Sequence, residues 1–157
     1  MSRGQYNPEW STRKNLRLSS RDYASAGAYF VTIRALLFEP AFFTIPALRH
    51  ILQEAWEALP ERFSHINLDE FVIMPDHIHF ILWLHRTEEK QVPLGSIVGA
   101  YKSLTTVTWI KHLKSIGRDM EYPCRIWQSN YYERVIRMNA LEQIRQYIRD
   151  NPSKLRT

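Results

Sequence analysis

The sequence of 157 residues contains one cysteine, Cys124, and no long apolar run. A single cysteine excludes an internal disulfide and a cysteine-based zinc site, and it is typical of proteins from a reducing compartment. No run approaches the roughly 18 apolar residues that are needed to span a bilayer. The N-terminal stretch MSRGQYNPEWSTRKNLRLSS also lacks the apolar segment of a secretory signal. We therefore expect a cytoplasmic protein without a membrane partner.

Glycine is also scarce, at 5 residues, and proline is not enriched, at 8, whereas 45% of the chain is hydrophobic. This composition argues against a disordered chain and, together with the length, predicts a single domain over residues 1–157. Lysine and arginine (21) outnumber aspartate and glutamate (16), which gives a net charge of +5. A basic domain can bind nucleic acid, an anionic membrane or neither. Residues 1–22 are polar and basic, and we expect them to form an N-terminal arm.

Hydrophobic periodicity predicts seven elements after this arm. We expect a strand at 28–36, a helix within 44–63, strands at 66–74 and 77–85, a helix within 92–117, a short hairpin or fourth strand within 125–138, and a helix within 139–152. This order predicts an α+β fold of the ferredoxin-like, split βαβ type, with an antiparallel sheet and an added C-terminal helix. The strands at 66–74 and 77–85 should form a hairpin, because Pro75 and Asp76 are typical turn residues.

The two later helices have more specific expected features. The helix within 92–117 should end at Gly117 and bury a stripe of apolar residues: Leu94, Ile97, Val98, Tyr101, Leu104, Val107 and Ile110. The last helix should begin at Asn139 as its N-cap and end before Pro152.

The segment MPDHIHFILWL places His77 and His79 one residue apart at the start of a strand. Alternate residues share one face of a strand, so the two imidazoles lie side by side. Such a pair can be a solvated or hydrogen-bonded strand end, or it can chelate a metal ion. The chain lacks the His-x-Glu and paired cysteines of nucleobase deaminases and the His-Glu-x-x-His motif of metalloproteases. A metal site would therefore require a third ligand from elsewhere in the chain.

The last helix offers a candidate for that ligand. Tyr147 and Asn151 lie one turn apart, on the apolar face that should pack against the rest of the domain. A tyrosine in such a stripe is usually a core residue, and an asparagine before a proline is usually a helix C-cap. Placed against the histidine strand, however, the pair would provide a phenol nucleophile and an amide oxygen ligand.

Four segments, FVIMPDHIHFILWL, VGAYKSLTT, IWQSNYYERVIR and IRQYIRDNP, resemble in order and spacing the REP-associated tyrosine transposases. These are relatives of the small single-tyrosine insertion-sequence transposases in the HUH nuclease superfamily. The resemblance implies metal ligation by His77, His79 and Asn151, and a catalytic tyrosine at Tyr147. Tyr131 and Tyr132 are alternative nucleophiles by composition, but they do not fit the Tyr-x-x-x-Asn pattern of the family.

The resemblance also implies an activity. A divalent ion, Mg²⁺ or Mn²⁺, would polarise a DNA phosphodiester, and Tyr147 would attack it to form a 5′-phosphotyrosyl link that can be reversed without ATP. The expected partner is single-stranded or hairpin DNA in a bacterial nucleoid, bound by a monomer or homodimer. Candidate phosphate contacts are Arg13, Lys14, Arg17, Arg21 and Lys102; the alternative is an ordinary solvated surface.

Two other functions are compatible with these residues. The protein could bind DNA hairpins as a regulator without cleaving them. It could also be a metal hydrolase of small molecules, although the chain shows no further carboxylate-rich site and this function does not explain the basic arm.

Overall fold

The computed structural model describes residues 26–37, 42–87, 92–123 and 125–155. The expected basic arm at 1–22 lies outside these residues. None of the helices in the described segments is long and apolar enough to cross a membrane.

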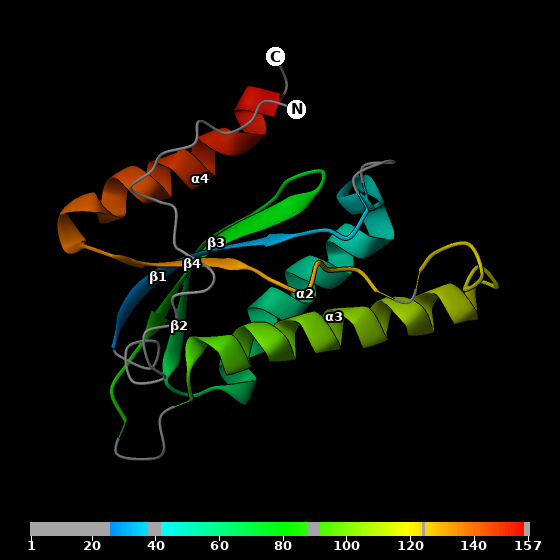
Figure 1. The fold of residues 1–157 in the computed structure, drawn as a ribbon, viewed down its shortest axis with the longest axis horizontal. Coiled ribbons are helices and arrows are strands. Elements are labelled where there is room, and N and C mark those ends of the chain that lie inside the picture. Colours follow the sequence, from blue (N-terminus) through cyan, green and yellow to red (C-terminus); the bar gives the residue numbers. More distant parts are fainter. Residues whose placement is uncertain (1–25, 38–41, 88–91, 124, 156–157) are drawn as a thin grey trace.

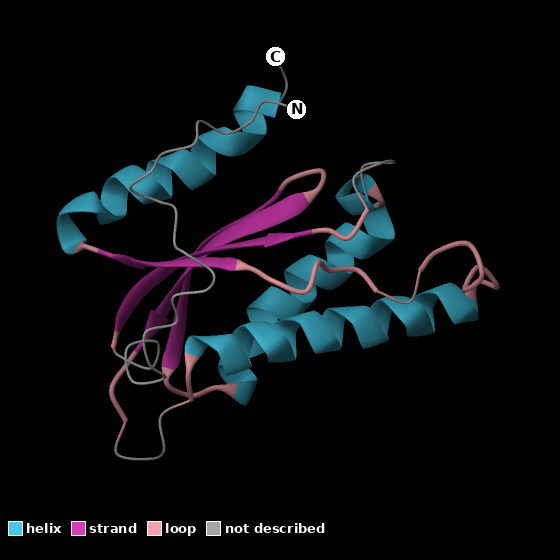
Figure 2. Cartoon of the chain, in the orientation of Figure 1, coloured by secondary structure: helices cyan, strands magenta, loops and turns pink. Residues whose placement is uncertain are grey.

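Four strands form one antiparallel sheet, drawn in magenta in Figure 2. They are β1 (Gly27–Arg34), β2 (Ile66–Ile73), β3 (His77–Leu84) and β4 (Tyr132–Ile136), in the spatial order β2-β3-β1-β4. Each neighbouring pair is antiparallel, and β2 and β3 form the expected hairpin. This is the strand order of the ferredoxin-like fold, so the predicted fold class is confirmed. The pattern of the sequence does not determine the partner of the fourth strand, and the structure pairs it with β1.

Helices cover both faces of the sheet (Figure 1). The helices α2 (Pro46–Arg62) and α3 (Leu94–Ser115) pack on one face, and α4 (Leu141–Leu155) lies on the other. Two short 3₁₀ turns, Phe42–Thr44 and Met138–Ala140, precede α2 and α4. The sheet therefore separates two cores of unequal size.

The alternation of β3 divides its side chains between these two cores. Ile78, Phe80 and Leu82 are buried in the larger core, with α2 and α3. Ile81 instead belongs to the smaller core, beneath Ile144 and Ile148 of α4. The histidines share the parity of Ile81, so they lie on the α4 face, as the period of a strand requires.

The buried stripe of α3 differs from the prediction in its second half. Leu104 and Val107 are exposed, and the stripe continues through Thr105, Trp109 and Leu113. Thr105 can be buried because its hydroxyl donates to the carbonyl of Tyr101 at 2.9 Å and accepts a hydrogen bond from the indole of Trp127 at 2.9 Å. The predicted stop is correct, since Gly117 has a left-handed φ of 71° directly after the C-cap.

Both predicted ends of α4 were wrong. Asn139 is not an N-cap, because it lies inside the 3₁₀ turn Met138–Ala140 that leads directly into α4. Pro152 does not end the helix, which continues to Leu155. Proline has a helical φ, but inside a helix it removes one backbone donor and its ring crowds the carbonyl four residues earlier. The buried packing of Ile144 and Ile148 can offset these costs. Asn151 consequently lies within the helix and is not a C-cap.

Candidate active site

The two histidines of β3 direct their Nε2 atoms toward each other. The Nε2 atom of His77 is 3.1 Å from the Nε2 atom of His79, and the ring centroids are 4.6 Å apart. His79 is 7% exposed, beneath α4. Two imidazole nitrogens that converge on one point at the start of a strand are suited to bind a single cation.

Asp76 orients the first histidine. Its carboxylate accepts a hydrogen bond from Nδ1–H of His77 at 2.6 Å, and the aspartate is only 4% exposed. A proton on Nδ1 leaves Nε2 as the nitrogen with a free lone pair. Carboxylates commonly orient metal-binding histidines in this way.

Thr32 of β1 holds the second histidine, with its Oγ1 at 2.8 Å from Nδ1 of His79. A threonine hydroxyl can donate or accept, so it accommodates either tautomer of the ring. When the hydroxyl donates, Nε2–H of His79 can donate to His77. When it accepts, Nε2 of both rings present lone pairs, which is the arrangement that a cation requires.

The surroundings favour neutral imidazoles. Burial lowers the pKa of His77 below its usual value, although the hydrogen bond to Asp76 opposes this shift. The pKa of His79 is well below its usual value, because of burial first and then the nearby charges of His77 and Arg34. Neutral imidazole is the form that binds metals.

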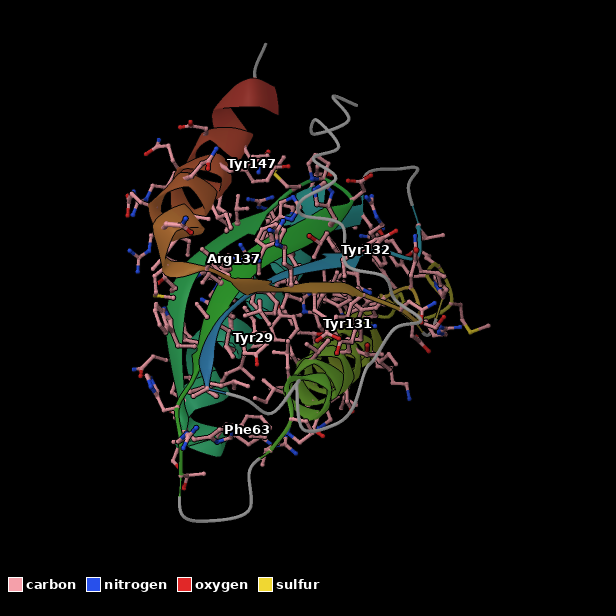
Figure 3. The ribbon with its side chains drawn as sticks, turned by 60° about the vertical axis from the view of Figure 1, so that its left-hand side comes forward. Tyr29, Phe63, Tyr131, Tyr132, Arg137 and Tyr147 are labelled. Atoms are coloured by element: carbon pink, nitrogen blue, oxygen red, sulfur yellow. The ribbon has the colours of Figure 1, made fainter. Side chains whose placement is uncertain are left out.

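Tyr147 reaches this pair from α4. Its ring centroid is 5.7 Å from that of His79, and both rings contact Phe30 of β1, at 6.4 Å and 5.4 Å respectively. The tyrosine is half-buried, and Figure 3 shows it on the side of α4 that faces the sheet. The structure thus brings the expected nucleophile against the expected metal ligands.

Asn151 lies one helical turn beyond Tyr147. Four helical residues advance about 6 Å, and the two strand residues from His79 to His77 span about 6.6 Å. Arg145 and Arg149 contact Asp69 and Glu70 in the same order along β2, which is antiparallel to β3, so α4 also runs antiparallel to β3. Asn151 therefore lies toward the His77 end of the strand relative to Tyr147. It is 5% exposed, and its amide nitrogen is buried without a hydrogen-bond partner in the described structure. Amide nitrogen and oxygen are assigned from their partners, so exchanging the two positions would place the oxygen at this unpartnered buried position.

Ion pairs hold α4 in this position. Arg145 donates two hydrogen bonds to Asp69 of β2, at 2.6 Å and 3.0 Å, and the indole of Trp83 donates a third at 2.9 Å. One turn on, Arg149 donates to Glu70 of β2 at 2.8 Å. Burial raises the pKa of Asp69, but the hydrogen bonds from Arg145 and Trp83 outweigh it and leave that pKa lowered. The carboxylate is therefore charged and paired at neutral pH.

The two alternative tyrosines lie farther from the histidines. Tyr131 is buried in the larger core, on the opposite face of the sheet, and its hydroxyl donates to Glu133 at 3.3 Å. Tyr132 shares the α4 face, but β1 separates it from β3, because Thr32 pairs with both Tyr132 and His79. Figure 3 shows Tyr132 and Tyr131 on opposite sides of β4.

The predicted DNA contacts are mostly outside the described residues. Arg13, Lys14, Arg17 and Arg21 belong to the N-terminal arm, of which the structure describes nothing. Lys102 of α3 donates to the carbonyls of Gln128 and Asn130, at 2.9 Å and 3.4 Å, on the sheet face away from the histidines. The structure therefore does not bring Lys102 together with the other predicted site residues.

Sequence reasoning missed the residues that support the site. Asp76 was interpreted only as a turn residue, although an acidic residue directly before a His-x-His pair is a signal for an orienting carboxylate. Thr32, Phe30 and Asp69 carry no such local signal, because strand pairing brings the first two to His79 and helix docking brings Asp69 to Arg145.

The donor set fits a divalent cation. Within the described part of the chain, no three His, Cys, Asp or Glu side chains gather where they could hold a metal. Among the described residues, the buried amide of Asn151, whose nitrogen has no hydrogen-bond partner, is a candidate third ligand. Two imidazoles and one amide leave coordination positions open for water or a phosphate oxygen.

Comparisons with known proteins identify the family. The family model "Transposase IS200 like" matches residues 44–151. An uncharacterised protein of Haemophilus influenzae is 32% identical, with 94% of this chain and 92% of the relative covered.

Two solved structures have similar folds. A REP-associated tyrosine transposase bound to a REP hairpin superposes with a TM-score of 0.60 at 19% identity, over 82% of this chain and 67% of that one. A putative transposase from Deinococcus radiodurans R1 superposes with a TM-score of 0.54 at 15% identity, over 80% and 91% of the two chains. The resemblance found in the sequence motifs is thus confirmed, and the chain belongs to the family of IS200-like transposases.

Proposed function

We propose that this transposase is a metal-dependent endonuclease and strand transferase that cleaves single-stranded DNA at hairpin-forming repeats through a phosphotyrosine. The observation that carries this proposal is the packing of Tyr147 against His79, whose Nε2 atom converges with that of His77. This packing brings a phenol from α4 to the imidazole pair of β3, which is the arrangement that the proposed chemistry requires. The cofactor is Mg²⁺ or Mn²⁺.

His77, His79 and Asn151 would hold the cation, which when bound supplies charge that polarises the scissile phosphate. Asp76 and Thr32 keep the two imidazoles in the required orientation. The Tyr147 oxygen attacks phosphorus, a Tyr–O–P bond forms, and the bond from phosphorus to the 3′ oxygen breaks. The phenol proton is lost and the departing 3′ oxygen gains a proton, so the step balances. Reversal by a 3′-hydroxyl rejoins strands, because the phosphotyrosyl bond conserves the phosphodiester energy.

The substrate is inferred from the neighbour and from the charge. The similar solved transposase is bound to a REP hairpin, and this chain has a net charge of +5. Arg13, Lys14, Arg17 and Arg21 of the basic arm would add phosphate contacts that weaken with salt. Lys102 is the weaker candidate, because backbone carbonyls already engage its ammonium group.

The test is formation of a covalent adduct. Labelled hairpin oligonucleotides with single-stranded flanks, incubated with the protein and Mn²⁺, should give a protein–DNA band that resists denaturation. Tyr147→Phe should abolish it, because the attacking oxygen is removed while the ring volume is retained. Mass spectrometry of the wild-type adduct should place the nucleotide on the peptide that contains Tyr147.

Matched variants make this test specific. Tyr132→Phe, on the same sheet face, and Tyr131→Phe, on the opposite face, should both retain the adduct. A nucleotide on the peptide that contains these two tyrosines would refute the assignment. Hairpin binding by a wild-type protein that never forms an adduct would instead support the alternative, a regulator that binds hairpins without cleaving them.

A further inference from the structure

The sheet face beneath α4 has two halves of different charge. On the β2 side, the arginines of α4 are neutralised, because Arg145 pairs with Asp69 and Arg149 pairs with Glu70. On the other side, β1 and β4 carry Arg34 and Arg134. No ion pair in the described part of the chain involves either of these two arginines.

Strand register places both arginines beside the candidate active site. Arg34 pairs with His77 across the β1–β3 ladder. Arg134 pairs with Phe30 across the β1–β4 ladder, and the Phe30 ring contacts both His79 and Tyr147. Paired residues lie one strand spacing apart, about 4.8 Å.

The alternation of side chains along each strand places both arginine side chains on the α4 face. Ala28 and Phe30 of β1, and Ile136 of β4, belong to the core beneath α4, so the even-numbered residues of both strands point to that side. Figure 3 shows Tyr132, which has the same parity, on the same side of β4 as Tyr147. Arg34 and Arg134 therefore lie next to the catalytic candidates and not behind them.

The guanidinium of Arg134 contains a buried donor group without an acceptor. Its Nη1 atom is buried without a hydrogen-bond partner. Buried donors in folded proteins nearly always have an acceptor, and exceptions call for an explanation. A phosphate group, like a carboxylate, matches the arginine fork, because its geometry permits two parallel hydrogen bonds.

We propose that the unpaired DNA strand approaches Tyr147 over the β1–β4 half of this face, and that Arg34 and Arg134 each bind one of its backbone phosphates. The inference rests on the proposed function, since it names the path of the strand into that site. The β2 side is unsuitable for the strand, because Asp69, Glu70 and Glu142 line it and its arginines are already paired.

The salt dependence of binding tests this path. Affinity for labelled oligothymidine, which presents a backbone without a hairpin, is measured at several salt concentrations in the Tyr147→Phe background. The slope of log K against log salt is negative, and each lost phosphate contact reduces its magnitude by about 0.7 for a single strand. Arg34→Gln and Arg134→Gln should each do so, and the double variant should lose about 1.4.

The matched control is Arg118→Gln, which removes the same charge from an exposed ion pair with Glu121 in the turn after α3. Its slope should equal that of the parent protein. Slopes for Arg34→Gln and Arg134→Gln that match Arg118→Gln would overturn the proposal. If a glutamine variant does not fold, Arg34→Lys and Arg134→Lys decide: weaker binding with an unchanged slope supports a bidentate phosphate contact, and unchanged binding overturns it.

The adduct assay with Tyr147 intact separates this inference from the proposed function. If the wild type forms an adduct and the arginine variants have unchanged slopes, the arginine contacts are refuted but the proposed nuclease activity is not. If the arginine variants have reduced slopes but the wild type forms no adduct, cleavage is refuted but the proposed path of the strand is not.

Discussion

Replacing Asp76 with alanine should weaken metal binding at the histidine pair without unfolding the domain. The carboxylate accepts from Nδ1–H of His77 at 2.6 Å, and no other described contact orients that nitrogen. Loss of such an outer partner typically lowers metal affinity 10- to 100-fold, which is about 1.4 to 2.7 kcal/mol. Asp76→Asn keeps an oxygen acceptor but loses the charge, so its affinity should fall between those of the wild type and Asp76→Ala.

The assay is a Mn²⁺ titration followed by calorimetry or by the electron paramagnetic resonance signal of free Mn²⁺. His77→Ala, which removes a proposed ligand, sets the lower limit of affinity. Asp119→Ala removes an equal charge from an exposed position in the turn after α3, and it should bind like the wild type. Melting temperatures of all variants show whether any loss of binding follows from unfolding.

Two results would contradict this reasoning in different ways. If Asp76→Ala binds Mn²⁺ like the wild type while His77→Ala does not, the histidine is a ligand but the carboxylate does not orient it. If both variants bind like the wild type, the histidine pair is not the metal site.

Two further predictions concern the docking of α4 and the protonation of the site. Arg145→Met should cost about 1.5–3 kcal/mol of unfolding free energy, measured by denaturant titration, because it breaks a charged hydrogen-bond pair to Asp69 and leaves that part-buried carboxylate less satisfied. Because the folded pKa of His79 lies below the ordinary 6.5, the unfolded chain binds more protons below that pH. The unfolding free energy, measured in the presence of a chelator, should therefore reach its full value above about pH 6.5 and decrease as the pH falls below that value. His79→Gln should make this decrease smaller.

Local periodicity was sufficient for much of the fold and for the residues that face each other. The two-residue period of a strand placed His77 and His79 on one side, and the structure puts them there. The four-residue spacing of Tyr147 and Asn151 likewise predicted a shared helix face, and both lie on the face that meets the sheet. These predictions depend only on neighbours within a turn or a pleat.

Properties that depend on tertiary context were not predictable in this way. The burial of Thr105 in place of Leu104 depends on a hydrogen bond from Trp127, which lies 22 residues later in the chain. The continuation of α4 through Pro152 depends on the packing that precedes it, and local rules stop a helix there. The link between Asp69 and Arg145 spans 76 residues, so no local pattern contains it.

The ion pairs of α4 connect the fold to the chemistry. Tyr147 lies between Arg145 and Arg149, so the two contacts to β2 fix the helix on both sides of the proposed nucleophile. The same contacts neutralise the charge of both arginines, so neither is available to bind DNA on the β2 side of the face. The unpaired arginines Arg34 and Arg134 lie on the opposite side of the histidines. One asymmetric arrangement of charge would therefore both position the tyrosine and determine the side from which a phosphate backbone reaches it.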